Sequence, residues 1–134
     1  MLVYDVVIIG GGVIGAAVAR TLSRFRLLVV LIEKESDLAM GASGANSGIV
    51  HAGYDPLPDS NKASLCVRGN RMMENLCDEL EVPFKRTGSL VVGYSDDDLR
   101  VLEELLARGR LNGLAGLEIL NQARLMTMEP NLSP

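Results

Sequence analysis

Three glycines near the N-terminus, Gly10, Gly12 and Gly15, have the spacing G-x-G-x-x-G. They follow an apolar run typical of a buried strand and precede a run with helical periodicity. In that context the first glycine permits a tight turn, the second lets a phosphate approach the main chain, and the third allows close packing of helix on strand. The pattern predicts a dinucleotide site. The alternative is that the glycines serve only the packing of the helix.

A carboxylate and two helix-start residues extend this candidate site. Glu33 lies eighteen residues after Gly15, where its carboxylate can accept hydrogen bonds from a ribose diol and repel a 2′-phosphate. Val13 and Ile14 begin the predicted helix, whose N–H groups and positive dipole end favour phosphates. Lys34 is either a solvated surface residue or a further contact to the nucleotide.

Two strands and a helix must position these residues. Residues 3–9 and 27–32 are short apolar runs rich in β-branched side chains, as in buried parallel strands. Residues 13–24 between them carry Ala, Leu and Val at helical spacing. A right-handed crossover would place the strands side by side. The predicted fold class is therefore α/β, a Rossmann-like βαβ unit with a parallel sheet.

A loop of small residues follows, Gly-Ala-Ser-Gly-Ala-Asn-Ser-Gly-Ile-Val-His-Ala-Gly at positions 41–53. With residues 4–12 and Ile32-Glu33-Lys34, it resembles the D-amino-acid-oxidase superfamily of FAD enzymes. Within that superfamily it is similar to the branch of glycerol-3-phosphate dehydrogenases and L-2-hydroxyglutarate oxidases. The resemblance continues through residues 87–90 and 129–130, so it covers the whole chain but only the beginning of the family's fold.

The resemblance implies that FAD is the cofactor and that its pyrophosphate and ribityl chain run along the small-residue loop. The loop residues that would contact FAD are Ser43, Gly44, Asn46, Ser47 and Gly48, with His51 and Ala52 near the isoalloxazine ring.

His51 is the one histidine of the chain and the candidate catalytic residue. It could polarise the flavin, contact substrate or transfer a proton. The alternatives are a structural hydrogen bond made by a loop histidine, or covalent attachment of FAD, which some relatives in the superfamily use.

The second half of the chain has a different pattern. Residues 60–80 carry apolar side chains at helical spacing, and Pro83 ends this element. Residues 84–87 and 89–94 have the composition of two short strands around Gly88. We therefore expect an α+β arrangement, the incomplete start of a substrate domain.

Capping signals predict the remaining helices. Ser95 followed by Asp98 indicates a helix start, and Asn121 is placed to cap a short helix that stops before Pro130. The expected domains are residues 1–82, the N-terminal part of an FAD-binding domain, and residues 83–134, the beginning of a truncated substrate domain.

Composition excludes several classes of protein. The net charge of −4 without a Lys/Arg cluster argues against nucleic-acid binding, and one His with two Cys offers no metal-ligand set. Cys66 and Cys77 would lie too far apart on one helix for a disulfide, which indicates a reducing, cytoplasmic compartment. The apolar run at residues 6–19 is too short to span a bilayer. Docking on a membrane surface stays open.

The expected function is the FAD-binding portion of a dehydrogenase or oxidase acting on a small hydroxy acid or polyol phosphate. A glycerol-3-phosphate dehydrogenase-like activity is preferred, with an L-2-hydroxyglutarate oxidase-like one as the alternative. A non-catalytic nucleotide-binding module or inactive fragment is a second alternative, and an NAD-dependent Rossmann enzyme is a third. At 134 residues the chain is shorter than a whole enzyme of this family. Contact with an electron acceptor, and self-association or a partner chain that completes the fold, are therefore also expected.

Overall fold

The computed structural model describes residues 3–132, and the chain divides into two compact units, Met1–Ile49 and Val50–Pro134. Within the described residues, no helix combines the length and apolar character that a membrane span needs. The domain division expected at residue 82 concerns the longer protein and stays a prediction.

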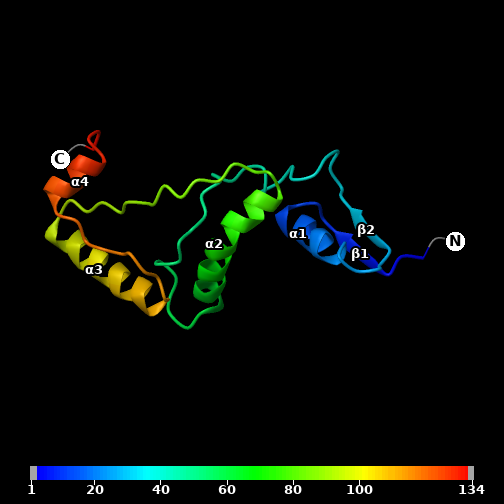
Figure 1. The fold of residues 1–134 in the computed structure, drawn as a ribbon, viewed down its shortest axis with the longest axis horizontal. Coiled ribbons are helices and arrows are strands. Elements are labelled where there is room, and N and C mark those ends of the chain that lie inside the picture. The colour runs from blue at the N-terminus through cyan, green and yellow to red at the C-terminus, as the bar shows by residue number, and fades with distance from the viewer. Residues whose placement is uncertain (1–2, 133–134) are drawn as a thin grey trace. The chain divides into compact units, whose positions relative to one another are not determined.

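The first unit is one βαβ motif (Figure 1): β1 (Val6–Ile9), α1 (Val13–Leu22) and β2 (Val29–Ile32). The strands are parallel, with Val6 opposite Val29 and Ile9 opposite Ile32, and α1 packs against both. The predicted α/β class and parallel pairing are confirmed. Ile8 is 9% exposed whereas Ile9 is 87% exposed, so α1 covers one face of the sheet and leaves the other open.

Gly15 is buried where α1 crosses β1. A Cβ atom added there would overlap the carbonyl oxygen of Gly10 and lie 3.4 Å from Cγ2 of Ile8. Gly10 itself has a φ of 100°, a backbone conformation that side chains disfavour. The close approach of helix to strand predicted for Gly15 is therefore present.

The described part of the second unit, up to residue 132, contains three helices: α2 (Asn61–Glu79), α3 (Asp96–Leu111) and α4 (Gln122–Met128). All three begin at a side-chain cap, because Ser60, Ser95 and Asn121 each accept a hydrogen bond from the main chain three residues ahead. Asp98 completes a reciprocal cap by accepting a 2.8 Å bond from the Ser95 hydroxyl. The predicted helices are confirmed, as are the caps predicted at Ser95 and Asn121; the cap at Ser60 was not predicted.

The two strands predicted at residues 84–87 and 89–94 are not formed. Figure 1 shows this stretch, in yellow-green between α2 and α3, as an extended chain without an arrow. A strand requires a neighbour to accept and donate its main-chain hydrogen bonds. Among residues 3–132 the only paired strands are β1 and β2. The residue types favoured extended backbone, but they could not indicate whether a partner lies within this chain.

The contact at Gly15 generates a stability prediction. We expect Gly15→Ala to lower the free energy of unfolding by roughly 1–3 kcal/mol, because the methyl group meets main-chain atoms that cannot rotate away. The matched control is Gly69→Ala on α2, where an added Cβ meets no atom within 4 Å. That change should be neutral or stabilising by about 0.5–1 kcal/mol. Urea denaturation of the two variants beside the unmodified protein checks both, and equal stabilities would contradict the prediction.

Candidate functional site

The candidate site is built around the N-terminus of α1. The N-cap of this helix is Gly12, which has no side chain to cap with, and no acidic residue lies in its first turn. By contrast, three aspartates occupy the first turn of α3. The first N–H groups of any helix lack intrahelical acceptors and carry the positive end of its dipole. At α1 that positive end is not neutralised by an acidic side chain of its own first turn, so it favours an anion.

Ser43 brings the small-residue loop onto this helix end. Its Oγ accepts a 2.9 Å hydrogen bond from the N–H of Val13, and a Cβ added to Gly12 would lie 3.2 Å from the same oxygen. The hydroxyl that accepts this bond still has its own hydrogen to donate. Ser43 can therefore hold Val13 and donate to a phosphate oxygen at the same time. The next helical residue, Ile14, is 78% exposed.

Glu33 closes the other side of the glycine turn. Its Oε2 accepts a 2.5 Å hydrogen bond from the N–H of Gly11, and its Oε1 accepts from the N–H groups of Lys34 at 2.8 Å and Glu35 at 3.0 Å. A carboxylate has about four acceptor positions. Three are thus occupied by the main chain, and one remains for a ribose hydroxyl unless a main-chain donor is displaced.

These main-chain donors lower the pKa of Glu33 below its ordinary value of 4.5. The Glu35 N–H contributes most and the Gly11 N–H next, with the charge of Lys34 adding a smaller effect. Glu33 is therefore an anion at neutral pH. The side chain of Lys34 is 87% exposed and pairs with Glu35 at 3.2 Å, so Lys34 lies on the surface.

The remaining loop residues predicted to bind the cofactor mostly hold the loop itself. The amide of Asn46 donates to the carbonyl of Ser43, and its Oδ1 accepts from the N–H of Gly48 at 2.7 Å. A Cβ on Gly44 would overlap the carbonyl oxygen of Ala39, and Ser47 is exposed. Asn46 and Gly44 thus have a visible structural role, and their contact with a cofactor stays a prediction.

His51 and Ala52 belong to the second unit. The imidazole of His51 is exposed, while its carbonyl oxygen accepts a 3.2 Å hydrogen bond from Nδ2 of Asn70 on α2. Ala52 lines a cavity in the same unit. A hydrogen bond to its main chain therefore holds the loop at His51, and the role of the imidazole stays a prediction.

Gly11 is a site residue that the sequence analysis did not single out. It is buried, its N–H orients the Glu33 carboxylate, and its carbonyl accepts a 3.1 Å bond from the N–H of Ala39. A Cβ on Gly11 would overlap Cδ2 of Leu38. The G-x-G-x-x-G pattern allows any residue at its second position, so it does not point to Gly11. The signal for Gly11 was that three glycines stand in a row at positions 10–12.

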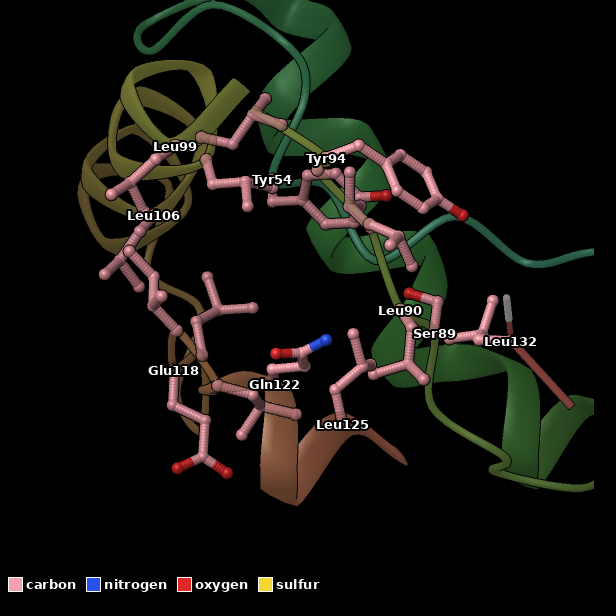
Figure 2. A pocket seen from close by; sticks show the side chains of 18 of the residues that line it. Tyr54, Ser89, Leu90, Tyr94, Leu99, Leu106, Glu118, Gln122, Leu125 and Leu132 are labelled. Atoms are coloured by element: carbon pink, nitrogen blue, oxygen red, sulfur yellow. The ribbon is translucent and has the colours of Figure 1, made fainter. Parts of the chain in front are cut away.

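A cavity of about 730 Å³ lies within the second unit and is lined mainly by apolar side chains. Figure 2 shows Leu99, Leu106, Leu90 and Leu125 around it, with the carboxylate of Glu118 at its margin. The lining residues include Asp96 and Glu118 but no Lys or Arg. The carboxylate of Glu118 is paired with Arg124 at 2.9 Å. With no cationic side chain in its lining, the cavity offers no charge partner for an anionic substrate.

No group of three or more His, Cys, Asp or Glu residues within 3–132 is arranged to hold a metal ion.

Arg68 and Arg71 on α2 line a groove in the second unit, and Arg71 donates to the carbonyl of Gly113 at 3.1 Å.

The lowered pKa of Glu33 predicts how its contribution to stability depends on pH. A carboxyl whose pKa is lower in the folded state stabilises the fold above its unfolded pKa, and this stabilisation is lost as pH falls through the folded pKa. We expect Glu33→Gln to melt at a lower temperature than the unmodified protein near neutral pH. The difference should shrink as pH falls below 4.5. Thermal unfolding from about pH 7 to about pH 3 checks this, with Glu35→Gln as the control. A difference that is constant across this range would contradict it.

Comparisons with known proteins identify the family. A family model described as FAD dependent oxidoreductase matches residues 5–134. A glycerol 3-phosphate dehydrogenase from Caloramator mitchellensis is 49% identical over 97% of the chain, and a mitochondrial L-2-hydroxyglutarate dehydrogenase from Caenorhabditis elegans is 41% identical over 96%. The chain covers 27% and 30% of these two proteins.

A solved structure agrees with these relatives. The L-alpha-glycerophosphate oxidase from Mycoplasma pneumoniae, dithionite-reduced and with FAD bound, superposes with a TM-score of 0.84 at 34% identity, over 97% of this chain and 35% of that one. The FAD expectation is thus confirmed for the family, and the chain belongs to the FAD-dependent oxidoreductases of the DAO family.

Proposed function

We propose that the protein carrying this chain is an FAD-dependent dehydrogenase or oxidase that acts on a small hydroxy compound, with glycerol 3-phosphate the preferred substrate. The observation that carries the proposal is the N-terminus of α1, which lacks an acidic residue and lies between the Ser43 hydroxyl and the Glu33 carboxylate. The relatives named for glycerol 3-phosphate and glycerophosphate oxidation support the choice of substrate.

The residues of the first unit fit FAD. A Cβ on Gly12 would fill the space beside the Ser43 hydroxyl, so glycine keeps this approach to the main chain open. We assign the pyrophosphate to the N–H groups of the first turn of α1 and to Ser43. The ribose would then donate to the acceptor position of Glu33 that its main-chain donors leave open.

When bound, FAD would supply the acceptor for the hydride lost by the carbon that carries the hydroxyl group. The chain's own contribution to that reaction is assigned to His51. An imidazole can accept and release a proton near neutral pH, and this one is exposed. We propose that His51 contacts the substrate hydroxyl and moves its proton. Ala52 beside it has a small side chain, which would leave room for the isoalloxazine ring that the family resemblance expects here.

A hydroxyglutarate substrate is the second candidate, favoured by the relatives named L-2-hydroxyglutarate dehydrogenase. The two substrates differ in the anion that must be held, a phosphate or a second carboxylate. The cavity in the second unit offers no cationic side chain for either group, so the anion-binding residue is assigned to another part of the protein. A non-catalytic FAD-binding module is the remaining alternative, and turnover distinguishes it.

We also propose that the protein works in a reducing, cytoplasmic compartment. Cys66 and Cys77 are free thiols on α2, and Cys77 is buried. Cell fractionation with an antibody against the protein tests this location.

The substrate proposal predicts which compound reduces the flavin. We expect glycerol 3-phosphate to bleach the flavin absorbance of the full-length protein under anaerobic conditions, and L-2-hydroxyglutarate to do so more slowly or not at all. Stopped-flow spectroscopy with each compound measures both rates. Faster bleaching by L-2-hydroxyglutarate would select the second candidate, and no bleaching by either compound would contradict the proposed activity.

A substitution at Gly12 tests the cofactor assignment. We expect Gly12→Val to weaken FAD binding by at least about 100-fold, because the side chain enters the space next to Ser43 and the first turn of α1. Titration of FAD into the apoprotein, followed by flavin fluorescence, gives the dissociation constants. Gly69→Ala serves as the control, since its added methyl group meets no neighbour. Unchanged affinity in Gly12→Val would remove the glycine turn from the cofactor site.

A further inference from the structure

We infer that Asn70 and Arg86 are positioning residues that fix the main chain at His51. This inference rests on the proposed function, because it assigns a purpose to a hydrogen-bond network that ends at the carbonyl of the proposed catalytic histidine. All the contacts that carry it lie within the second unit.

The network starts at a polar side chain of α2. Asn70 is partly buried, and its Nδ2 donates to the carbonyl oxygen of His51 at 3.2 Å. Its Oδ1 accepts a 3.2 Å hydrogen bond from Nη1 of Arg86, whose Nη2 also reaches the carbonyl oxygen of Asn70 at 3.4 Å. A guanidinium can only donate. Arg86 therefore holds the amide with its oxygen toward the guanidinium and its NH₂ group toward His51.

Arg86 is itself held on two further sides. Its Nε donates to Oε2 of Glu74 at 3.0 Å, one turn along α2 from Asn70. Its guanidinium carbon lies 5.5 Å from the centre of the Phe84 ring. The planar fork of arginine can make these contacts together, whereas lysine has a single charged nitrogen. Arg86 therefore braces Asn70 on α2.

The chain next to His51 is fixed independently. Gly53 has a φ of 104°, and a Cβ there would lie 2.8 Å from Cγ2 of Val67 on α2. In addition, the amide of Asn112 at the end of α3 donates to the carbonyls of Gly53 and Pro56, at 2.9 Å each. The segment after His51 is thus held by α2 and α3, and Asn70 holds the carbonyl at its start. A main chain restrained in this way presents the exposed imidazole from a defined position, which proton transfer requires.

Asn70→Asp removes the hydrogen bond from residue 70 to the His51 carbonyl but keeps the contact with Arg86. A carboxylate at residue 70 still accepts from Arg86, but it has no N–H to donate and it repels the His51 carbonyl. The matched control is Asn75→Asp, which makes the same change on an exposed residue of the same helix. Arg86→Lys keeps the charge beside Glu74 but removes the fork, so it should give a smaller effect of the same kind.

The test is a double-mutant cycle with His51→Ala in the full-length protein loaded with FAD. With the compound that reduces the flavin, glycerol 3-phosphate or L-2-hydroxyglutarate, we expect Asn70→Asp to slow flavin reduction roughly 10- to 100-fold. In the His51→Ala background the same change should alter the rate by less than about twofold, because the two residues act as one unit. FAD affinity should stay unchanged. Equal effects in both backgrounds would overturn the inference, since they would indicate a general structural role.

The flavin absorbance spectrum keeps the inference testable if neither compound is a substrate. His51→Ala should perturb the visible spectrum of bound FAD, and Asn70→Asp should perturb it in the same direction while Asn75→Asp does not. A spectrum changed by His51→Ala and not by Asn70→Asp would overturn the positioning role alone. A spectrum unaffected by His51→Ala would instead remove His51 from the flavin site, and with it the inference that depends on it.

Discussion

The close approach of α1 to β1 at Gly15 is the contact on which the candidate site depends. Without a side chain at this position, the helix comes so near the strand that an added Cβ would overlap the carbonyl of Gly10. This contact fixes where the first turn of α1 lies relative to the end of β1. The N–H groups that favour an anion are consequently placed at the carboxyl edge of the sheet, where ligands of open parallel sheets bind.

Charge around this helix end is distributed in a way that suits a dinucleotide. The helix brings a positive dipole end without an acidic residue in its first turn, and Glu33 brings a full negative charge on the far side of the glycine turn. The N–H of Gly11 holds that carboxylate in place, while Ser43 contacts the start of the helix. Phosphates need hydrogen-bond donors or positive charge, whereas ribose hydroxyls can donate to a carboxylate. The glycine turn places these two kinds of partner, the start of α1 and Glu33, on its two sides.

Much of the fold of the first unit could be predicted from its sequence, because the interactions that form the βαβ motif are local. The glycine spacing and two apolar runs were enough to specify the βαβ motif, and the predicted caps at Ser95 and Asn121 likewise act within a few residues. The formation of strands at residues 84–94 could not be predicted from local sequence, because a strand needs a second strand, distant in the sequence, to pair with. The hydrogen bonds from Val13 to Ser43 and from Asn70 to His51 join residues 30 and 19 positions apart. No periodic pattern in the sequence predicts such contacts.

Hydrogen–deuterium exchange of the full-length protein, with and without FAD, tests the central claim most directly. Binding at the glycine turn predicts that FAD slows exchange of the main-chain N–H groups of residues 11–15 and 43–48, because the bound cofactor shields these segments from water and restrains their opening. Exchange along α3, whose first turn already carries three aspartates, should stay unchanged. Saturable FAD binding that leaves residues 11–15 unprotected would contradict the account.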